Sequence, residues 1–98
     1  MRPTLEALLG KTGLRVLEYH LEKLLQADPY NILFNEPHRF YLAVKSIFGQ
    51  GADMMIRIVA KKMIEEGVLE ASDPSELLEA LKDQQKGREK LLKMLRLL

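Results

Sequence analysis

Apolar residues recur along most of the chain at the three- and four-residue spacing of an amphipathic α-helix. The first stripe consists of Leu14, Leu17, Leu21, Leu24 and Leu25. It predicts a helix from Thr12, a suitable N-cap, to about Ala27. Asp28-Pro29 ends this helix, because a residue before proline avoids the α conformation. A short turn of helix over residues 4–9 precedes it and stops at Gly10.

The next segment, residues 28–35, predicts a linker whose apolar middle packs against the core. A second helix is expected from Asn35 as cap, with Pro37 tolerated in its first turn. Its apolar stripe consists of Phe40, Val44, Ile47 and Phe48, widened by Tyr41. Gly49-Gln50-Gly51 should end the helix, since the first glycine suits the left-handed position just after a helix end. We interpret Gly49 and Gly51 as a structural turn.

Residues 52–66 form the most apolar predicted helix. Its apolar residues are Met54, Met55, Ile56, Ile58, Val59, Ala60, Met63 and Ile64, which occupy most of the circumference. A helix of this kind is buried on several sides, so we expect it at the centre of the molecule. Gly67 should end it.

The strongest helix start in the chain is Asp73-Pro74-Ser75-Glu76, which combines an N-cap, a proline and a glutamate three residues after the cap. Gly87 leaves two alternatives open. One helix could run from Pro74 to Leu98 and carry Gly87 at a cost of about 1 kcal/mol relative to alanine. Alternatively, the chain breaks or bends at Gly87, which we favour slightly.

These elements predict an all-α fold, a compact bundle of four to five helices. Residues 1–66 should form a helical core domain, and residues 67–98 a C-terminal extension that packs on the core or on a partner subunit. The predicted core residues are Leu17, Leu21, Phe40, Val44, Phe48, Met55, Ile56, Val59 and Met63.

Composition narrows the function classes. The 98 residues contain no cysteine, which excludes disulfide scaffolds, thiolate zinc sites and cysteine nucleophiles. The formal net charge of +1 gives no global reason to expect nucleic acid or an anionic membrane as partner. No secretory signal and no uncharged stretch of 18 residues is evident, so we expect a cytoplasmic protein without a membrane span.

The chain contains histidine, glutamate and serine residues, but their spacing does not match that of a metal site, an acid–base pair or a nucleophile motif. His20 and His38, the only histidines, have no carboxylate in register for a metal site. The glutamate pairs 18/22 and 65/66 are interpreted as solvated ion-pair partners, and the serines 46, 72 and 75 lie in no nucleophile motif. Gly49-x-Gly51 follows a helix and lacks the lysine of a phosphate loop. We therefore predict no catalytic residue, no cofactor and no metal, and a protein that is not an enzyme.

The C-terminal segment offers two candidate surfaces. Its basic residues are Lys86, Arg88, Lys90, Lys93 and Arg96, and the leucines that recur on one face are Leu91, Leu92, Leu95 and Leu98. One neighbouring helix covers a single stripe, so we predict that the leucines mediate self-association, most simply as a two-fold homodimer. The favoured function is a protein–protein interaction or signalling-output module whose partner the sequence does not identify. The alternative is a nucleic-acid-binding protein that uses the basic residues.

Four short segments resemble a known family. They are Leu9-Gly10-x-x-Gly13-Leu14, Tyr19-His20-Leu21-Glu22, Pro37-x-x-Phe40 and Ile47-Phe48-Gly49-x-Gly51-Ala52. Together they are similar to the Nitrosopumilus-type output domain, a small archaeal helical module, over about residues 5–66. The resemblance implies a helical fold and an interaction-mediating role, and it supplies no catalytic residues.

Overall fold

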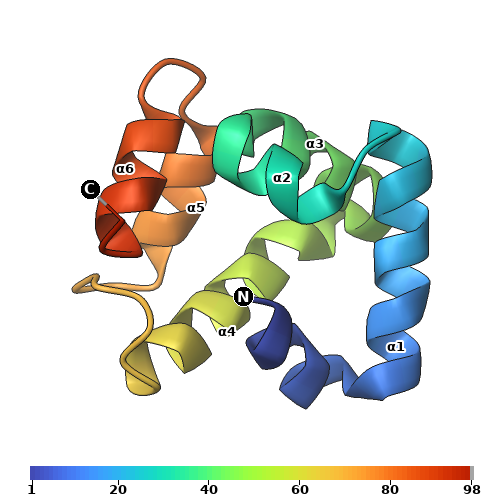
Figure 1. The fold of residues 1–98 in the computed structure, drawn as a ribbon. Coiled ribbons are helices and arrows are strands. Elements are labelled where there is room, and N and C mark those ends of the chain that lie inside the picture. The colour runs from blue at the N-terminus through green and yellow to red at the C-terminus, as the bar shows by residue number, and fades with distance from the viewer. Residues whose placement is uncertain (98) are drawn as a thin grey trace.

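The computed structural model describes residues 1–97, and every regular element in them is helical. The elements are α1 (Arg2–Leu25), α2 (Pro29–Asn35), α3 (Pro37–Phe48), the 3-10 turn η1 (Gly49–Gly51), α4 (Ala52–Glu65), α5 (Ser75–Lys82) and α6 (Gly87–Met94). They form a compact bundle with a radius of gyration of 12.4 Å (Figure 1). The predicted all-α fold is confirmed.

Helix α1 contains a sharp kink that divides it into an N-terminal turn and a long arm. Gly10 has φ 76° and ψ 168°, a conformation outside the helical region. The residues before it lie across one end of the molecule, whereas the arm stands along its side (Figure 1). Gly10 thus separates the two segments at the residue where the sequence predicted the first helix to stop. The C-terminal end of α1 is Leu25, two residues before the predicted Ala27.

Helix α2 occupies the segment that we predicted as a linker, and this expectation was wrong. Asp28 caps the helix, because its carboxylate accepts the backbone N–H of Tyr30 at 2.9 Å. Pro29 fits the first helical position, where no N–H is required. The apolar middle of the segment does pack on the core as expected, since Ile32 and Leu33 are buried.

The α3–η1–α4 connection depends on Gly49. This residue ends α3 with φ 59° and ψ −131°, whereas Gly51 has an ordinary φ of −77°. Phe48, the last residue of α3, is 37% exposed, so its predicted place in the core was wrong, whereas the neighbouring Ile47 packs against the core.

Replacing Gly49 by alanine should lower the free energy of unfolding by about 1 kcal/mol or more, because a side chain disfavours this backbone conformation. The cost is conformational rather than steric, since no atom lies within 4 Å of the added Cβ. Gly51→Ala is the matched control: its Cβ also meets open space, and its φ is negative. Equal urea-denaturation midpoints for the two variants would contradict this explanation.

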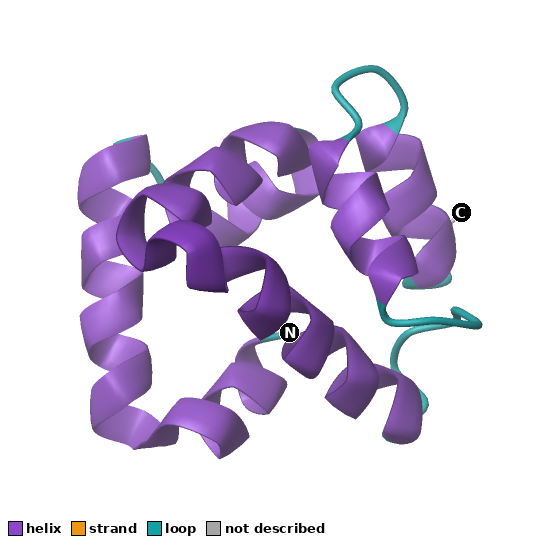
Figure 2. Cartoon of the chain, turned by 180° about the vertical axis from the view of Figure 1, so that it is seen from behind, coloured by secondary structure: helices purple, strands orange, loops and turns teal. Residues whose placement is uncertain are grey.

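Helix α4 crosses the middle of the molecule on the face seen from behind (Figure 2). Its inner side supplies buried residues, among them Ile56, Val59 and Met63. Its outer side faces solvent, where Met54 is 66% and Ile58 50% exposed. The prediction that α4 is buried on several sides therefore holds only for its inner face.

Helices α5 and α6 lie side by side at the other side of the bundle and run in opposite directions (Figure 1). A non-helical loop separates them. Helix α5 begins at Ser75 with Pro74 in the cap position, one residue later than predicted, and the Asp73 carboxylate accepts the backbone N–H of Ser75 at 2.7 Å. The break follows Lys82, where the Asp83 carboxylate accepts the backbone N–H groups of Gln85 and Lys86 at 2.9 Å. The chain therefore takes the second alternative, two helices, with Gly87 as the first residue of α6.

One hydrophobic core joins the segments on either side of residue 66. Val44 and Val59 lie in the same cluster of buried residues as Leu77, Leu81 and Leu91. The C-terminal segment thus packs on the core of its own chain. None of the helices in residues 1–97 combines the length and hydropathy needed to cross a membrane.

Candidate functional site

A small apolar cavity lies between four helices. Its volume is about 20 Å³. The lining residues come from α1, α3, α4 and α5 and the residue before α1, and all are apolar: Met1, Leu5, Leu17, Leu21, Phe40, Val44, Met55, Ile56, Val59, Leu77 and Leu81. A cavity of this size has room for a water molecule but offers it no hydrogen-bond partner. Its lining offers apolar contacts only.

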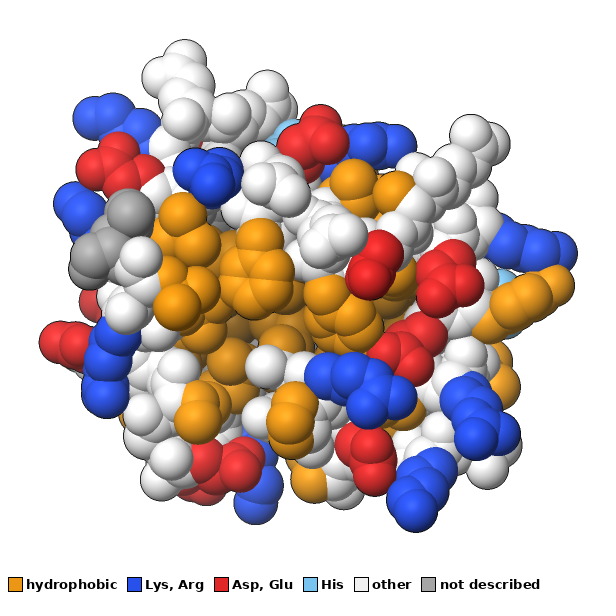
Figure 3. Space-filling view, viewed as in Figure 1, with side chains coloured by type: hydrophobic (Ala, Val, Ile, Leu, Met, Phe, Trp, Pro, Cys, Tyr) orange, Lys and Arg blue, Asp and Glu red, His pale blue; other side chains and the backbone are white. Residues whose placement is uncertain are grey.

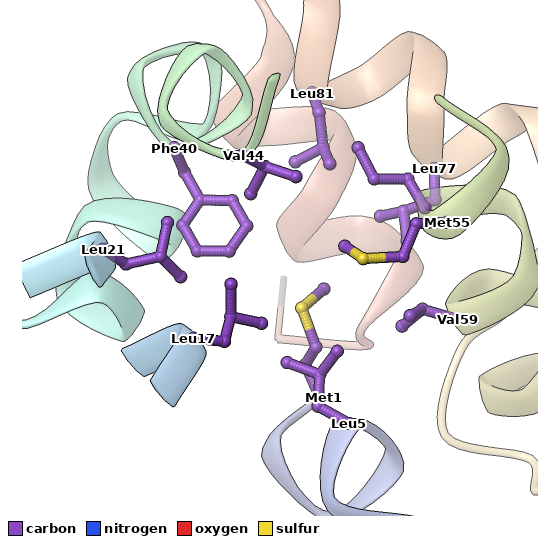
Figure 4. Close-up of a pocket in the computed structure, with 11 residues that line it drawn as sticks. Met1, Leu5, Leu17, Leu21, Phe40, Val44, Met55, Val59, Leu77 and Leu81 are labelled. Atoms are coloured by element: carbon purple, nitrogen blue, oxygen red, sulfur yellow. The ribbon is translucent and has the colours of Figure 1, made fainter. Parts of the chain in front are cut away.

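Two methionines stand at the cavity. Met1 and Met55 are both partly exposed, and their side chains reach toward each other across the space (Figure 4). Hydrophobic side chains also gather around a hollow on the face that carries the N-terminus (Figure 3). Because a methionine side chain is flexible and polarisable, it adapts its shape to a group that packs against it.

The N-terminal turn, residues 1–9, covers one side of the cavity. Within this turn Leu5 is buried, and the Met1 side chain extends into the cavity (Figure 4). Arg2 donates from Nε to the Glu18 carboxylate at 3.0 Å, which ties the turn to the long arm of α1. The same carboxylate accepts the Tyr30 hydroxyl at 2.7 Å. Burial and this hydrogen bond to Glu18 raise the pKa of Tyr30 well above its usual value.

A polar cluster fastens α3, α4 and α5 beside the Gly49 turn. The Tyr41 hydroxyl donates to Asp53 Oδ1 at 2.7 Å, and Lys82 Nζ donates to Asp53 Oδ2 at 3.0 Å. The Tyr41 hydrogen bond, followed by that of Lys82, lowers the pKa of Asp53. Every charged group here has a partner in the fold, which is the arrangement of a structural cluster.

These lowered pKa values predict acid sensitivity. The pKa of Asp83 is also low, chiefly because its carboxylate accepts the Lys86 N–H and then pairs with Lys90. Below about pH 4 the unfolded chain takes up protons at both carboxylates before the folded chain does, so the free energy of unfolding falls. Urea midpoints measured from pH 7 to pH 3 should show this decrease, and Asp83→Asn should make it shallower. An unchanged pH dependence in that variant would contradict the assignment.

The histidines lie apart from the cavity. His20 is exposed, and its ring packs edge-on against Tyr19 with centroids 5.7 Å apart. His38 is half-buried and contains a buried Nδ1 without a hydrogen-bond partner. Within residues 1–97 no group of three or more histidines and carboxylates is placed to hold a metal ion.

The other candidate polar residues have structural contacts. Glu18 binds Arg2 and Tyr30, whereas Glu22, Glu65 and Glu66 are exposed. The Ser72 backbone N–H donates to Glu76 at 2.7 Å, the Ser75 hydroxyl accepts from Arg57 at 3.3 Å, and Ser46 is exposed. The structure does not bring these residues together.

The C-terminal leucines are placed differently from our expectation of a self-association face. Leu91 is fully buried, and Leu92 is 9% exposed. Leu95 is partly buried against the core, and Leu98 lies outside the described residues. Helix α6 packs on α5, α2 and α3 of its own chain, so Leu91 and Leu92 are already covered.

The basic residues of the same segment are largely paired. Lys90 contacts Asp83 at 2.7 Å, Lys93 contacts Glu89 at 3.2 Å and Arg96 contacts Glu70 at 3.1 Å. Lys86 and Arg88 make no ion pair within the described residues. Carboxylates beside three of the five cations weaken the local attraction for phosphates, which weighs against the nucleic-acid alternative.

Sequence reasoning missed the cavity, although it assigned several of its lining residues to the core. Met1 lies outside every helix that the sequence predicted, and Met55 was predicted to be a buried core residue. The cavity is formed by side chains from segments far apart in the sequence, so no local motif marks it.

No protein-family model matches the chain, and neither a curated protein nor a solved structure shows significant similarity to it.

Proposed function

We propose that this chain is a non-enzymatic protein–protein interaction module, and that the apolar surface at the cavity, with its two methionines, packs against an apolar side chain of a partner protein. The observation that carries the proposal is the lining of the cavity, which consists of apolar side chains alone. A ligand with polar groups would leave them without hydrogen bonds in such a site. An aliphatic side chain has no hydrogen bond to lose there, and it buries its own apolar surface.

Two further observations support this role. The partly exposed Met1 and Met55 provide an adaptable rim, which is typical of surfaces that accept apolar groups. Apart from the α-amino group of Met1, whose pKa is lowered by burial, the titratable groups of the described residues lie away from the cavity, mostly in ion pairs or in solvent. The resemblance to the Nitrosopumilus-type output domain points to the same class of function. The self-association and cytoplasmic location expected from the sequence remain predictions, as does the archaeal origin that the resemblance implies.

Affinity capture with matched variants tests the proposal. The tagged chain is incubated with an extract of its source cells, in parallel with Met55→Glu and Ile58→Glu. Both substitutions place a carboxylate on α4. Met55 lines the cavity, whereas Ile58 is half-exposed on the outer side of the same helix.

Proteins captured by the wild-type chain should be lost with Met55→Glu and retained with Ile58→Glu. Circular dichroism and urea denaturation establish that both variants are folded. Retention of the same proteins by the folded Met55→Glu variant would overturn the proposed site. Loss with Ile58→Glu alone would place the interaction on the outer face of α4.

A further inference from the structure

The N-terminal turn is joined to the molecule through a hinge that only glycine fits well. The φ of 76° and ψ of 168° at Gly10 lie in a region that other residues essentially never adopt. No atom lies within 4 Å of a Cβ added at Gly10, so the requirement for glycine is conformational rather than steric. If Gly10 became helical, α1 would continue without a kink.

A straight α1 would remove the turn from its own subunit. Its 24 residues would span about 36 Å, whereas the longest extent of the folded molecule is 30 Å. Residues 1–9 would therefore project from the body. The cavity wall that Met1 and Leu5 now cover would then face solvent.

Few contacts hold the turn in place. Thr4 and Leu5 are buried, and Met1 packs partly on the core. Among the described side chains, the Arg2–Glu18 bond is the only hydrogen bond from residues 1–9 to the rest of the chain. Arg2 is also largely exposed, so this contact contributes little to holding the turn.

We propose that two copies of this chain exchange their N-terminal turns. Residues 1–9 of one copy then cover the cavity of the other, with Met1, Leu5 and Arg2 making between chains the contacts that they make here within one chain. A second copy fits this surface because its turn has the same residues and the same complementary charge for Glu18. Exchange produces a closed two-fold dimer, and it requires a helical Gly10 in each chain.

The inference is independent of the proposed function, because it concerns copies of this chain alone. It also places self-association at the N-terminus, whereas the sequence suggested the C-terminal leucines. Those leucines stay inside each subunit in the exchanged dimer.

The first test is Gly10→Ala. Alanine disfavours the kinked conformation and favours the helical one, so the ratio of straight to kinked chains should rise on the order of 100-fold. Sedimentation should show a dimer at concentrations where the wild-type chain is monomeric. Gly51→Ala, which introduces the same methyl group at a negative φ, should leave the sedimentation unchanged.

The second test shows which segments meet. The chain has no cysteine, so Arg2→Cys and Glu18→Cys introduce unique thiols. The two variants are mixed at high micromolar concentration and treated with a short bis-maleimide, both with Gly10 retained and with Gly10→Ala. A crosslinked heterodimer is expected in both backgrounds and should be more abundant with Gly10→Ala. Leu8→Cys mixed with Glu18→Cys is the control, because Leu8 is exposed on the turn and should crosslink poorly.

Absence of the Arg2→Cys/Glu18→Cys heterodimer in the background that retains Gly10 would overturn the proposal, whether or not Gly10→Ala folds. A Gly10→Ala dimer without this crosslink would also overturn it, since another surface would then hold the two copies together. Neither result depends on partner capture, so it leaves the proposed function unaffected.

Discussion

Gly87→Ala should destabilise the protein by about 3 kcal/mol, toward the upper end of the usual cost of overpacking. Gly87 is buried at the first position of α6, and a Cβ there would overlap the carbonyl oxygen of Ala80. A backbone oxygen cannot rotate away as a side chain does. The substitution therefore forces α5 and α6 apart. This movement is costly, because Leu77 of α5 and Leu91 of α6 are packed in the core.

Helix propensity alone predicts the opposite sign, because alanine is favoured over glycine by up to about 1 kcal/mol in a helix. The overlap should dominate and lower the melting temperature by more than about 10 °C in a domain of this size. Gly51→Ala is the control, since its Cβ meets no atom within 4 Å. A melting temperature for Gly87→Ala at or above that of the wild-type chain would show that the two helices are not in this close contact.

Leu81→Ala should cost about 2–5 kcal/mol, because it removes a buried side chain and leaves a void. Leu81 is fully buried on α5 and lines the apolar cavity. The void would join the existing cavity rather than be filled by neighbours, which places the expected loss in the upper half of that range. Urea denaturation monitored by circular dichroism measures it.

Leu42→Ala is the matched control for Leu81→Ala. Leu42 is 52% exposed on α3, and its truncation should change the free energy of unfolding by about 0.5 kcal/mol or less. Similar losses in the two variants would contradict the position of α5 in the core.

Helical periodicity and the glycine and proline positions were sufficient to predict the fold class and most helix ends. Gly10 and Gly49 interrupt the helical pattern, and both adopt a positive φ in the structure. The Asp73 carboxylate accepts the backbone N–H of Ser75 at the start of α5, a local contact that needs no tertiary packing. Such features depend on neighbouring residues along the chain, which the sequence displays directly.

Features that depend on contacts between distant segments were not predictable in the same way. Seven residues are too few to distinguish a helix from an apolar linker by period, so α2 was missed. Phe48 has the spacing of a core residue, yet it is 37% exposed at the end of α3. Leu91 has the spacing of an interface residue, yet α6 buries it within its own subunit.

The candidate site was the least predictable part, because its lining comes from four helices and the residue before the first. Leu17, Leu21 and Val59 were expected to fill a continuous core, and the small void between them has no signature in the residue pattern. The turn at Gly49 was predictable, since its positive φ is a local backbone feature, whereas Gly51 has an ordinary negative φ and the turn does not require a glycine there.

Methyl NMR of the methionines tests the proposed docking site most directly. Met1 and Met55 line the cavity, Met54 lies exposed on the outer face of α4, and Met63 is buried. Addition of a captured partner to the full chain, labelled at the methionine methyl groups, should shift the Met1 and Met55 signals and leave Met54 unchanged. A shift of Met54 with unchanged Met1 and Met55 signals would contradict the assignment of the cavity as the site of interaction.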